Sequence, residues 1–165
     1  KSDTLFLFYK KGMNPRVWKG FFKISTDEGK SWSESAEIPD LIGPVKNRPL
    51  HLKNGNLLSP SSIEFSEKDW KVHLEISENR GKTWRKIPVN YDQKDVQVIQ
   101  PSILKHRDES LQLVARSQQN KVMTAFSNDN GETWLRWEAT NLANPNSGTD
   151  AIRLKNNKFK LESLN

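Results

Sequence analysis

The sequence predicts an all-β fold, a β-propeller of four-stranded antiparallel blades of which about three are present. The pattern Ser-x-Asp/Asn-x-Gly-x-Ser/Thr-Trp occurs at residues 25–32, 77–84 and 127–134, with starts 52 and 50 residues apart. A period near 50 residues indicates a repeat architecture. Segments typical of strands fill each period, and helix signals are nearly absent. Four-stranded sheets repeated radially are propeller blades.

The first unit begins with Leu5-Phe6-Leu7-Phe8-Tyr9-Lys10, an apolar and aromatic run that predicts a buried strand. A loop rich in turn formers follows over residues 11–18. We expect the next strands at residues 20–25 and 33–38, on either side of the first eight-residue pattern, and a connection at residues 39–44.

The second and third units repeat this plan. In the second, Asn54-Gly55 predicts a two-residue hairpin turn. The strands expected in these two units are residues 46–52, 56–65, 70–76 and 84–89, then 100–104, 111–116 and 122–126. A fourth unit begins with a strand at residues 150–154, a turn at Asn156-Asn157 and a strand at residues 159–164.

The whole unit repeats, because Arg48, Gln100 and Asp150 show the same spacings of 52 and 50 residues. The expected blades are residues 1–44 (incomplete), 45–96, 97–147 and 148–165 (the start of a further blade). A propeller closes with about four to eight blades, so we expect an incomplete ring, completed by further chain or by a second copy in a homodimer. Light scattering tests the second copy, which a monomer would exclude.

The three eight-residue segments, here called the boxes, have a structural explanation. Gly29, Gly81 and Gly131 supply the positive φ of a tight turn. The residue two positions before each glycine (Asp27, Asn79, Asp129) accepts backbone N–H groups, and the tryptophans pack the turn against a sheet. Asn79 lacks the charge, so the middle box should be slightly weaker. A site in every repeat is more often scaffold than chemistry.

Composition excludes several classes. The net charge of +6 is scattered through all repeats, which argues against nucleic acid and supports a mild preference for anionic ligands. The sequence contains no run of 18 apolar residues, so it predicts no membrane-spanning helix. The chain has no cysteine, and its three histidines (His51, His73, His106) are dispersed without ligand spacing, so we expect neither a metal nor a cofactor.

Candidate site residues lie on the face opposite the boxes, where the channel of a propeller opens. They are polar or aromatic residues at the ends of inner strands and in the loops beside them. The set is Lys10, Trp18, Lys46, Asn47, Arg48, Ser61, Ser62, Glu64, Trp70, Gln100, Arg116, Asn144, Asn146, Ser147, Thr149 and Asp150.

Within this set, Asp150 is the first candidate for acid/base catalysis, because it begins an inner strand, and Glu64 is the second. Arg48 and Arg116 offer planar forks suited to a carboxylate. Each arginine can instead pair with a neighbouring acid such as Glu64 or Asp150. Trp18 and Trp70 would stack on a sugar ring or pack between blades.

The boxes, together with the segments at residues 43–49, 59–64, 99–102 and 144–150, resemble the sialidase-like repeat family, also called the bacterial neuraminidase (BNR) or Asp-box family. This resemblance implies exo-acting hydrolysis at a glycan terminus and an extracellular or periplasmic location. Sialidases bind the substrate carboxylate with three arginines and use a tyrosine nucleophile assisted by a glutamate. Arg48, Arg116 and Arg153 match such a cluster in type, but neither Tyr9 nor Tyr91 has a glutamate partner in sequence.

Two further functions stay open. A propeller that cleaves uronate-containing polysaccharide would use the same arginines for a carboxylate. A non-catalytic module that binds glycans or proteins needs only the scaffold. Turnover of a fluorogenic sialoside separates hydrolysis from binding alone.

Overall fold

The computed structural model describes residues 4–79 and 81–163, which form four antiparallel sheets and no α-helix. The chain divides into two compact units, one ending at Gly43 and one beginning at Pro44. A single 3₁₀ turn (Pro15–Val17) interrupts the strands of the first unit. The described part of the chain contains no helix with the length and apolar character that a bilayer crossing needs.

The first unit is a three-stranded sheet in the order β1-β2-β3, formed by β1 (Leu5–Lys11), β2 (Lys19–Ser25) and β3 (Ala36–Ile38). Phe6, Phe8 and Phe22 gather on one face, with ring centroids 6.0–6.2 Å apart. The third strand is shorter than the expected range of residues 33–38.

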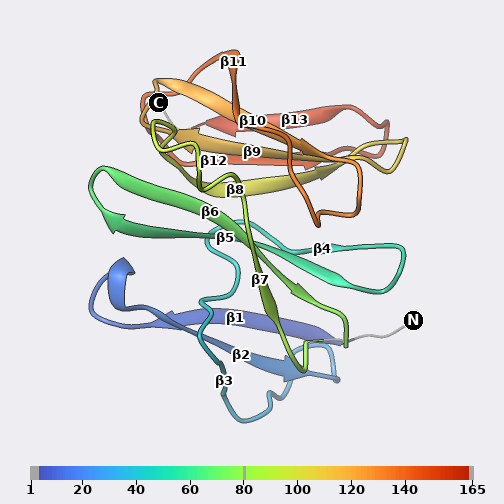
Figure 1. The fold of residues 1–165 in the computed structure, drawn as a ribbon. Helices are drawn as coiled ribbons and strands as arrows, with labels where there is room; N and C mark the ends of the chain where they lie inside the picture. Colours follow the sequence, from blue (N-terminus) through green and yellow to red (C-terminus); the bar gives the residue numbers. More distant parts are fainter. Residues whose placement is uncertain (1–3, 80, 164–165) are drawn as a thin grey trace. The chain divides into compact units, whose positions relative to one another are not determined.

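The second unit contains two four-stranded sheets and one hairpin (Figure 1). The second sheet has the order β4-β5-β6-β7, and the third sheet has the order β11-β10-β9-β8. The strands of the second sheet are β4 (Leu50–His51), β5 (Leu57–Ser66), β6 (Asp69–Ser77) and β7 (Arg85–Pro88). Those of the third sheet and the hairpin are β8 (Val98–Lys105), β9 (Leu111–Ser117), β10 (Lys121–Ser127), β11 (Glu138–Ala143), β12 (Thr149–Arg153) and β13 (Phe159–Ser163).

The strand expected over residues 46–52 is the clearest difference. Only Leu50 and His51 pair with β5, because the preceding Pro49 has no N–H for a ladder. Residues 46–48 form a loop instead, with Lys46 at a positive φ of 71°. This loop carries three of the candidate site residues.

Apolar side chains fill the spaces between the sheets of the second unit. The larger core lies between the second and third sheets and includes Leu58, Leu74, Leu113 and Ala125, each at most 1% exposed. A smaller core, with Leu104, Val122 and Ala151, joins the third sheet to the β12–β13 hairpin. Packing therefore fixes the three sheets of residues 44–163 as one body.

All three boxes adopt one turn. In each, the glycine N–H donates to the hydroxyl of the first serine (2.7–3.0 Å), and the tryptophan Nε1 donates to the glycine carbonyl (3.0–3.1 Å). The Asp or Asn Oδ1 accepts the N–H of the Ser or Thr four residues later at 2.8–2.9 Å. In the first box, the bonds to the Asp27 carboxylate, that from the Ser31 hydroxyl first, lower the pKa of Asp27 to about 2. The structural role expected for the boxes matches this bonding.

Candidate functional site

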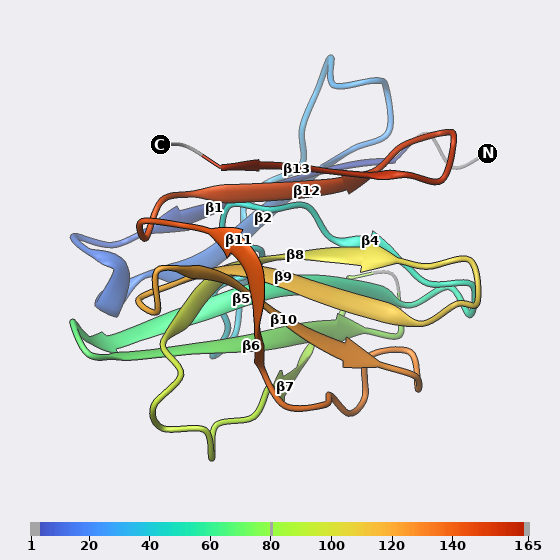
Figure 2. The same ribbon diagram turned by 90° about the horizontal axis from the view of Figure 1, so that it is seen from above.

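The connections at one end of the second unit carry the candidate site. The β5–β6, β9–β10 and β11–β12 connections lie at this end, whereas the box turn between β10 and β11 and the turns β8–β9 and β12–β13 lie at the other (Figure 2). Antiparallel strands with short turns impose this separation, since alternate connections must fall at opposite ends.

Arg116, the penultimate residue of β9, is the centre of one group. Its Nε donates to Asn146 Oδ1 at 3.1 Å, and one terminal nitrogen donates to Gln100 Oε1 at 3.3 Å. Its Cζ lies 5.5 Å from the centroid of the Trp70 ring, a cation–π distance. Trp70 is only 8% exposed, so it forms a fixed floor under the guanidinium.

The charge of Arg116 is not neutralised by a direct ion pair with any acid of residues 4–79 or 81–163. Burial lowers the pKa of Arg116, and the carboxylate of Glu64 partly opposes this shift. Glu64 sits opposite Trp70 in the β5–β6 ladder. Guanidinium presents five N–H donors, and Asn146 and Gln100 accept only two of them. The remaining donors are available for the oxygens of an anion.

The backbone at Gln100 explains how this residue reaches Arg116. The β8–β9 register shifts between Ile99 and Ser102, and Gln100 has a positive φ of 54°. A bulge re-aims a side chain from its expected direction. The Gln100 N–H donates to Ser62 Oγ at 3.1 Å, so the bulge is tied to the second sheet.

A second group surrounds Lys46 and Asn47. Lys46 Nζ donates to the carbonyl of Thr149 at 2.6 Å, and Asn47 Nδ2 donates to the carbonyl of Gln100 at 3.0 Å. Asn47 is 5% exposed. This loop therefore joins the second sheet to the third sheet and to β12, and it holds the site end of the unit together.

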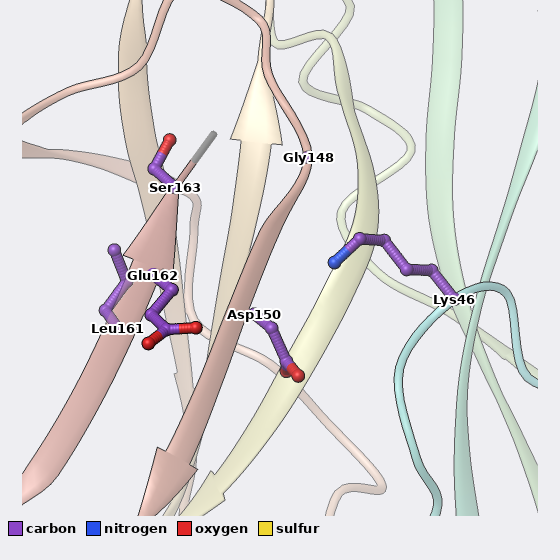
Figure 3. Close-up of a pocket in the computed structure, with 6 residues that line it drawn as sticks. All are labelled: Lys46, Gly148, Asp150, Leu161, Glu162 and Ser163. Atoms are coloured by element: carbon purple, nitrogen blue, oxygen red, sulfur yellow. The ribbon is translucent and has the colours of Figure 1, made fainter. Parts of the chain in front are cut away.

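Asp150 lies in a pocket of about 570 Å³ beside this group (Figure 3). Its Oδ1 accepts the Ser102 hydroxyl at 3.0 Å and the Ala151 N–H at 2.8 Å. Glu162 is the direct partner of Asp150 in the β12–β13 ladder, and its side chain extends toward Asp150. Lys46 lies on the other side of Asp150, and the lining is completed by Gly148, Leu161 and Ser163.

The predicted site residues are thus only partly brought together. Arg116, Gln100, Asn146, Lys46 and Asn47 form the network just described. Arg48 does not join it: this residue is exposed and makes no hydrogen bond or ion pair with any residue that the structure describes. Ser147 serves the loop itself, with its N–H and carbonyl bonded to the Asn144 side chain. Trp18, half-buried, belongs to the first unit.

Two residues of the site were not among the sequence-based candidates. Ser102 bonds Asp150, and Glu162 faces it across the hairpin. The spacing of Ser102 and Asp150 by 48 residues, close to one repeat, places them at near-equivalent positions of adjacent first strands, and this signal could have found Ser102. Glu162 follows only from the register of β12 with β13.

Within the described residues, neither tyrosine hydroxyl bonds a residue of this network. Burial raises the pKa of Tyr91 to about 12, with the Asp69 carboxylate as a smaller cause. Tyr9 bonds the Ser35 hydroxyl in the first unit. Within the described residues, no group of three acidic or histidine side chains could hold a metal ion.

Comparison with known proteins gives one family match. The model of the BNR repeat-like domain matches residues 1–161. No curated protein matches the sequence.

Solved structures share the fold at low identity. A protein of unknown function from Dyadobacter fermentans is 21% identical with a TM-score of 0.76, over 96% of this chain and 52% of that one. A Trypanosoma rangeli sialidase, in complex with sialic acid, is 18% identical (TM-score 0.67; 98% and 32% covered). The intramolecular trans-sialidase of Ruminococcus gnavus is 19% identical (TM-score 0.64; 84% and 30%). The chain thus spans about half of the first of these proteins and about a third of the other two.

Proposed function

The chain belongs to the sialidase-like family of BNR repeat-like domains, and from this premise we propose that it is part of a glycoside hydrolase that acts on terminal acidic sugars of glycans. Its sheets are consecutive blades of a β-propeller, whose ring is completed by further blades or by a second copy. The single observation that carries the proposal is Arg116, held over Trp70 by two neutral side chains with donors to spare.

In this proposal, Arg116 binds the carboxylate of the sugar. A charge-assisted bond from a guanidinium is short and directional, so it orients the ring as well as holding it. Asn146 and Gln100 fix the plane of the fork, and Trp70 supports it from below. Asp150 would serve as the acid/base: it gives a proton to the glycosidic oxygen as the bond to the anomeric carbon breaks, and it takes a proton from the water whose oxygen bonds to that carbon.

A fluorogenic sialoside tests this assignment. We expect Arg116→Ala to lower kcat/KM by about a hundredfold or more, because the carboxylate loses its charged partner. Asp150→Ala should lower kcat by a similar factor of about 10²–10⁴, the usual contribution of a general acid. The matched controls are Arg136→Ala and Asp92→Ala, which remove an exposed ion pair of 2.9 Å elsewhere in the unit and should leave turnover unchanged.

Each outcome has a defined meaning. Turnover that survives both Arg116→Ala and Asp150→Ala would show that the site lies elsewhere. Turnover of a fluorogenic glucuronide but not of the sialoside would favour the uronate-cleaving alternative. Saturable sialic acid binding that depends on Arg116, without turnover of either substrate, would favour a glycan-binding module. The Arg116 site suits all three ligands, since a sialoside, a glucuronide and sialic acid each carry a carboxylate.

A further inference from the structure

A second pocket lies at the opposite end of the unit from Arg116 and Asp150. Its volume is about 330 Å³. His106, Arg107 and Asp108 of the β8–β9 turn line one side, and Arg153, Asn157 and Phe159 of the β12–β13 hairpin line the other. Both turns are at the end where the box turns lie (Figure 2). None of these six residues takes part in the proposed hydrolysis.

The lining of the pocket carries two arginines and one carboxylate, that of Asp108. Arg153 donates to two neutral oxygens, the Lys105 carbonyl at 3.2 Å and Asn157 Oδ1. Arg107 makes no hydrogen bond or ion pair within residues 4–79 and 81–163. The two arginines outnumber the one carboxylate of the lining, so a net positive charge is left for a ligand.

The two acids of the β8–β9 turn have partners other than these arginines. Asp108 Oδ1 accepts both the N–H and the hydroxyl of Ser110, at 3.1 and 2.7 Å. These two bonds, the hydroxyl first, lower the pKa of Asp108. Glu109, the next residue, pairs with Lys53 at 2.9 Å and with Lys105 at 2.7 Å. Within the described residues, neither carboxylate makes an ion pair with Arg107 or Arg153.

One wall of the pocket is aromatic and fixed in place. The rings of His106 and Phe159 meet edge to face, with centroids 4.7 Å apart. His106 Nε2 bonds Gln112 Oε1 at 2.9 Å, and Gln112 Nε2 in turn donates to Thr124 Oγ1 at 2.9 Å. The Thr124 hydroxyl donates its proton to the Leu113 carbonyl, so it accepts the bond from Gln112 Nε2. Gln112 Oε1 is then the acceptor toward His106, and His106 Nε2 is the donor. Phe159 is 38% exposed, so an apolar ring face remains for stacking.

We propose that this pocket is a second anion-binding site, which takes the carboxylate or sulfate group of an acidic sugar. Two arginine forks bind the charged oxygens, and Phe159 stacks on the ring. A volume near the lower limit of small-molecule sites suits one sugar residue. The site would anchor a glycan at the end remote from Arg116, and it binds its anion whether or not the chain hydrolyses a glycoside.

Three histidines make the binding directly observable. The chain contains only His51, His73 and His106, so histidine-selective isotope labelling gives three ring signals, assigned with one His→Gln variant each. Sodium sulfate, glucuronic acid and neutral glucose are titrated to roughly 50 mM at constant ionic strength, a range that covers millimolar Kd values. We expect saturable shifts of the His106 signal with sulfate and glucuronic acid, and none with glucose.

The other two signals serve as internal controls. His73 is 3% exposed and bonded to Glu75, and an unchanged His73 signal reports that a variant keeps its fold. Arg107→Gln should raise the Kd of both anions about tenfold, since one charge-assisted contact is lost. Lys82→Gln makes the same change of net charge on an exposed turn outside the pocket and should leave the affinity unaltered. Arg153→Lys keeps the charge but loses the fork, and should also weaken binding.

Arg116→Gln separates this site from the proposed function. This variant should abolish turnover, while the shift of the His106 signal on addition of sulfate or glucuronic acid should stay unchanged. Saturation with sulfate but not with glucuronic acid would identify a sulfate ester as the ligand group, and the reverse would identify a carboxylate. The proposal is overturned if His106 shows no saturable shift with either anion, if glucose shifts it equally, or if Arg107→Gln and Lys82→Gln weaken binding to the same extent.

Discussion

Asn79 reverses one hydrogen bond of its box. In the first and third boxes a hydroxyl, from Ser31 or Thr133, donates to the aspartate carboxylate. In the middle box Asn79 Nδ2 donates to Thr83 Oγ1 at 2.7 Å instead. The other bonds of the turn are kept, because the amide retains one acceptor oxygen. The middle box thus differs in charge and not in shape.

Asn79→Asp should stabilise the protein by less than about 1 kcal/mol at pH 7, because three donors, the Ser77 hydroxyl and the N–H and hydroxyl of Thr83, would then face a charged acceptor at an exposed position. Like Asp27, the new carboxylate should have a lowered pKa. A carboxyl group whose pKa is lower in the folded than in the unfolded state stabilises the fold at any pH above its unfolded-state pKa. This stabilisation is lost as the pH falls through the folded-state pKa. Urea unfolding at pH 7 and near pH 2 measures the gain and its loss. An equal or lower midpoint at pH 7 would refute the charge argument.

At the residue scale, the sequence predicted the turn of the boxes well, but it did not distinguish the surroundings of Arg116 from those of Arg48. All the bonds of a box join residues within eight positions, so spacing alone determines them. Arg116 and Arg48 read alike in sequence, since both flank inner strands. Their different surroundings come from the Gln100 bulge and from Pro49, whose effects depend on pairing with another strand.

The strand β6 is buried on both faces and carries unlike residues on each. Val72, Leu74 and Ile76 belong to the larger core, while His73 and Glu75, on the alternate face, are 3% and 0% exposed. Alternation of this kind predicts a strand with one face in water. The sequence therefore gave no sign that the polar face is buried, because burial depends on what covers it.

Acid should weaken the fold through His73. Burial lowers the pKa of His73 from 6.5, and the hydrogen bond to Glu75 only partly opposes this. Below pH 6.5 the unfolded chain binds a proton at His73 that the folded chain does not. The contribution of His73 to the free energy of unfolding is therefore fully present above pH 6.5 and decreases as the pH falls below this value. Unfolding free energies at pH 7.5 and 5.5 should differ by up to about 1.4 kcal/mol from this residue.

His73→Gln isolates that contribution, because glutamine keeps a donor for Glu75 and does not titrate. The pH dependence between 7.5 and 5.5 should become shallower in this variant. The exposed His51, changed in the same way, serves as the control and should preserve the wild-type slope. Parallel slopes for the wild type and His73→Gln would mean that His73 titrates normally in the folded state.

The third box also takes part in packing between sheets. A methyl group on Gly131 would lie 2.8 Å from Leu58 Cδ2, in the second sheet, and 3.5 Å from Leu111 Cδ1. Gly55 has the same φ of +88°, yet nothing lies within 4 Å of its missing methyl. The two glycines share one backbone requirement and differ only in their neighbours.

Gly55→Ala should cost about 1–2 kcal/mol for the left-handed backbone, and Gly131→Ala about 1–3 kcal/mol more for the displaced Leu58. Urea midpoints at constant m value give both numbers. The difference between the two variants measures how firmly the second and third sheets pack. Equal costs would mean that Leu58 moves aside freely.

For the whole molecule, the period predicted which strands form a sheet, and every sheet pairs only neighbours in sequence. The convergence of the site was harder to predict. Asn47 reaches carbonyls on the third sheet and β12, 53 and 102 residues away, and Glu162 meets Asp150 by register alone. Contacts between sheets depend on packing distances that a repeat pattern does not contain.

The closed bonding of each box has a consequence for sequence divergence. Five of its eight positions recur in kind, and the other three differ among the boxes, except that the first two boxes share a lysine (Lys30 and Lys82). A structure of 21% identity still covers 96% of the chain at a TM-score of 0.76. A turn that is held by five positions leaves the rest of the repeat free to differ in sequence while the fold is kept.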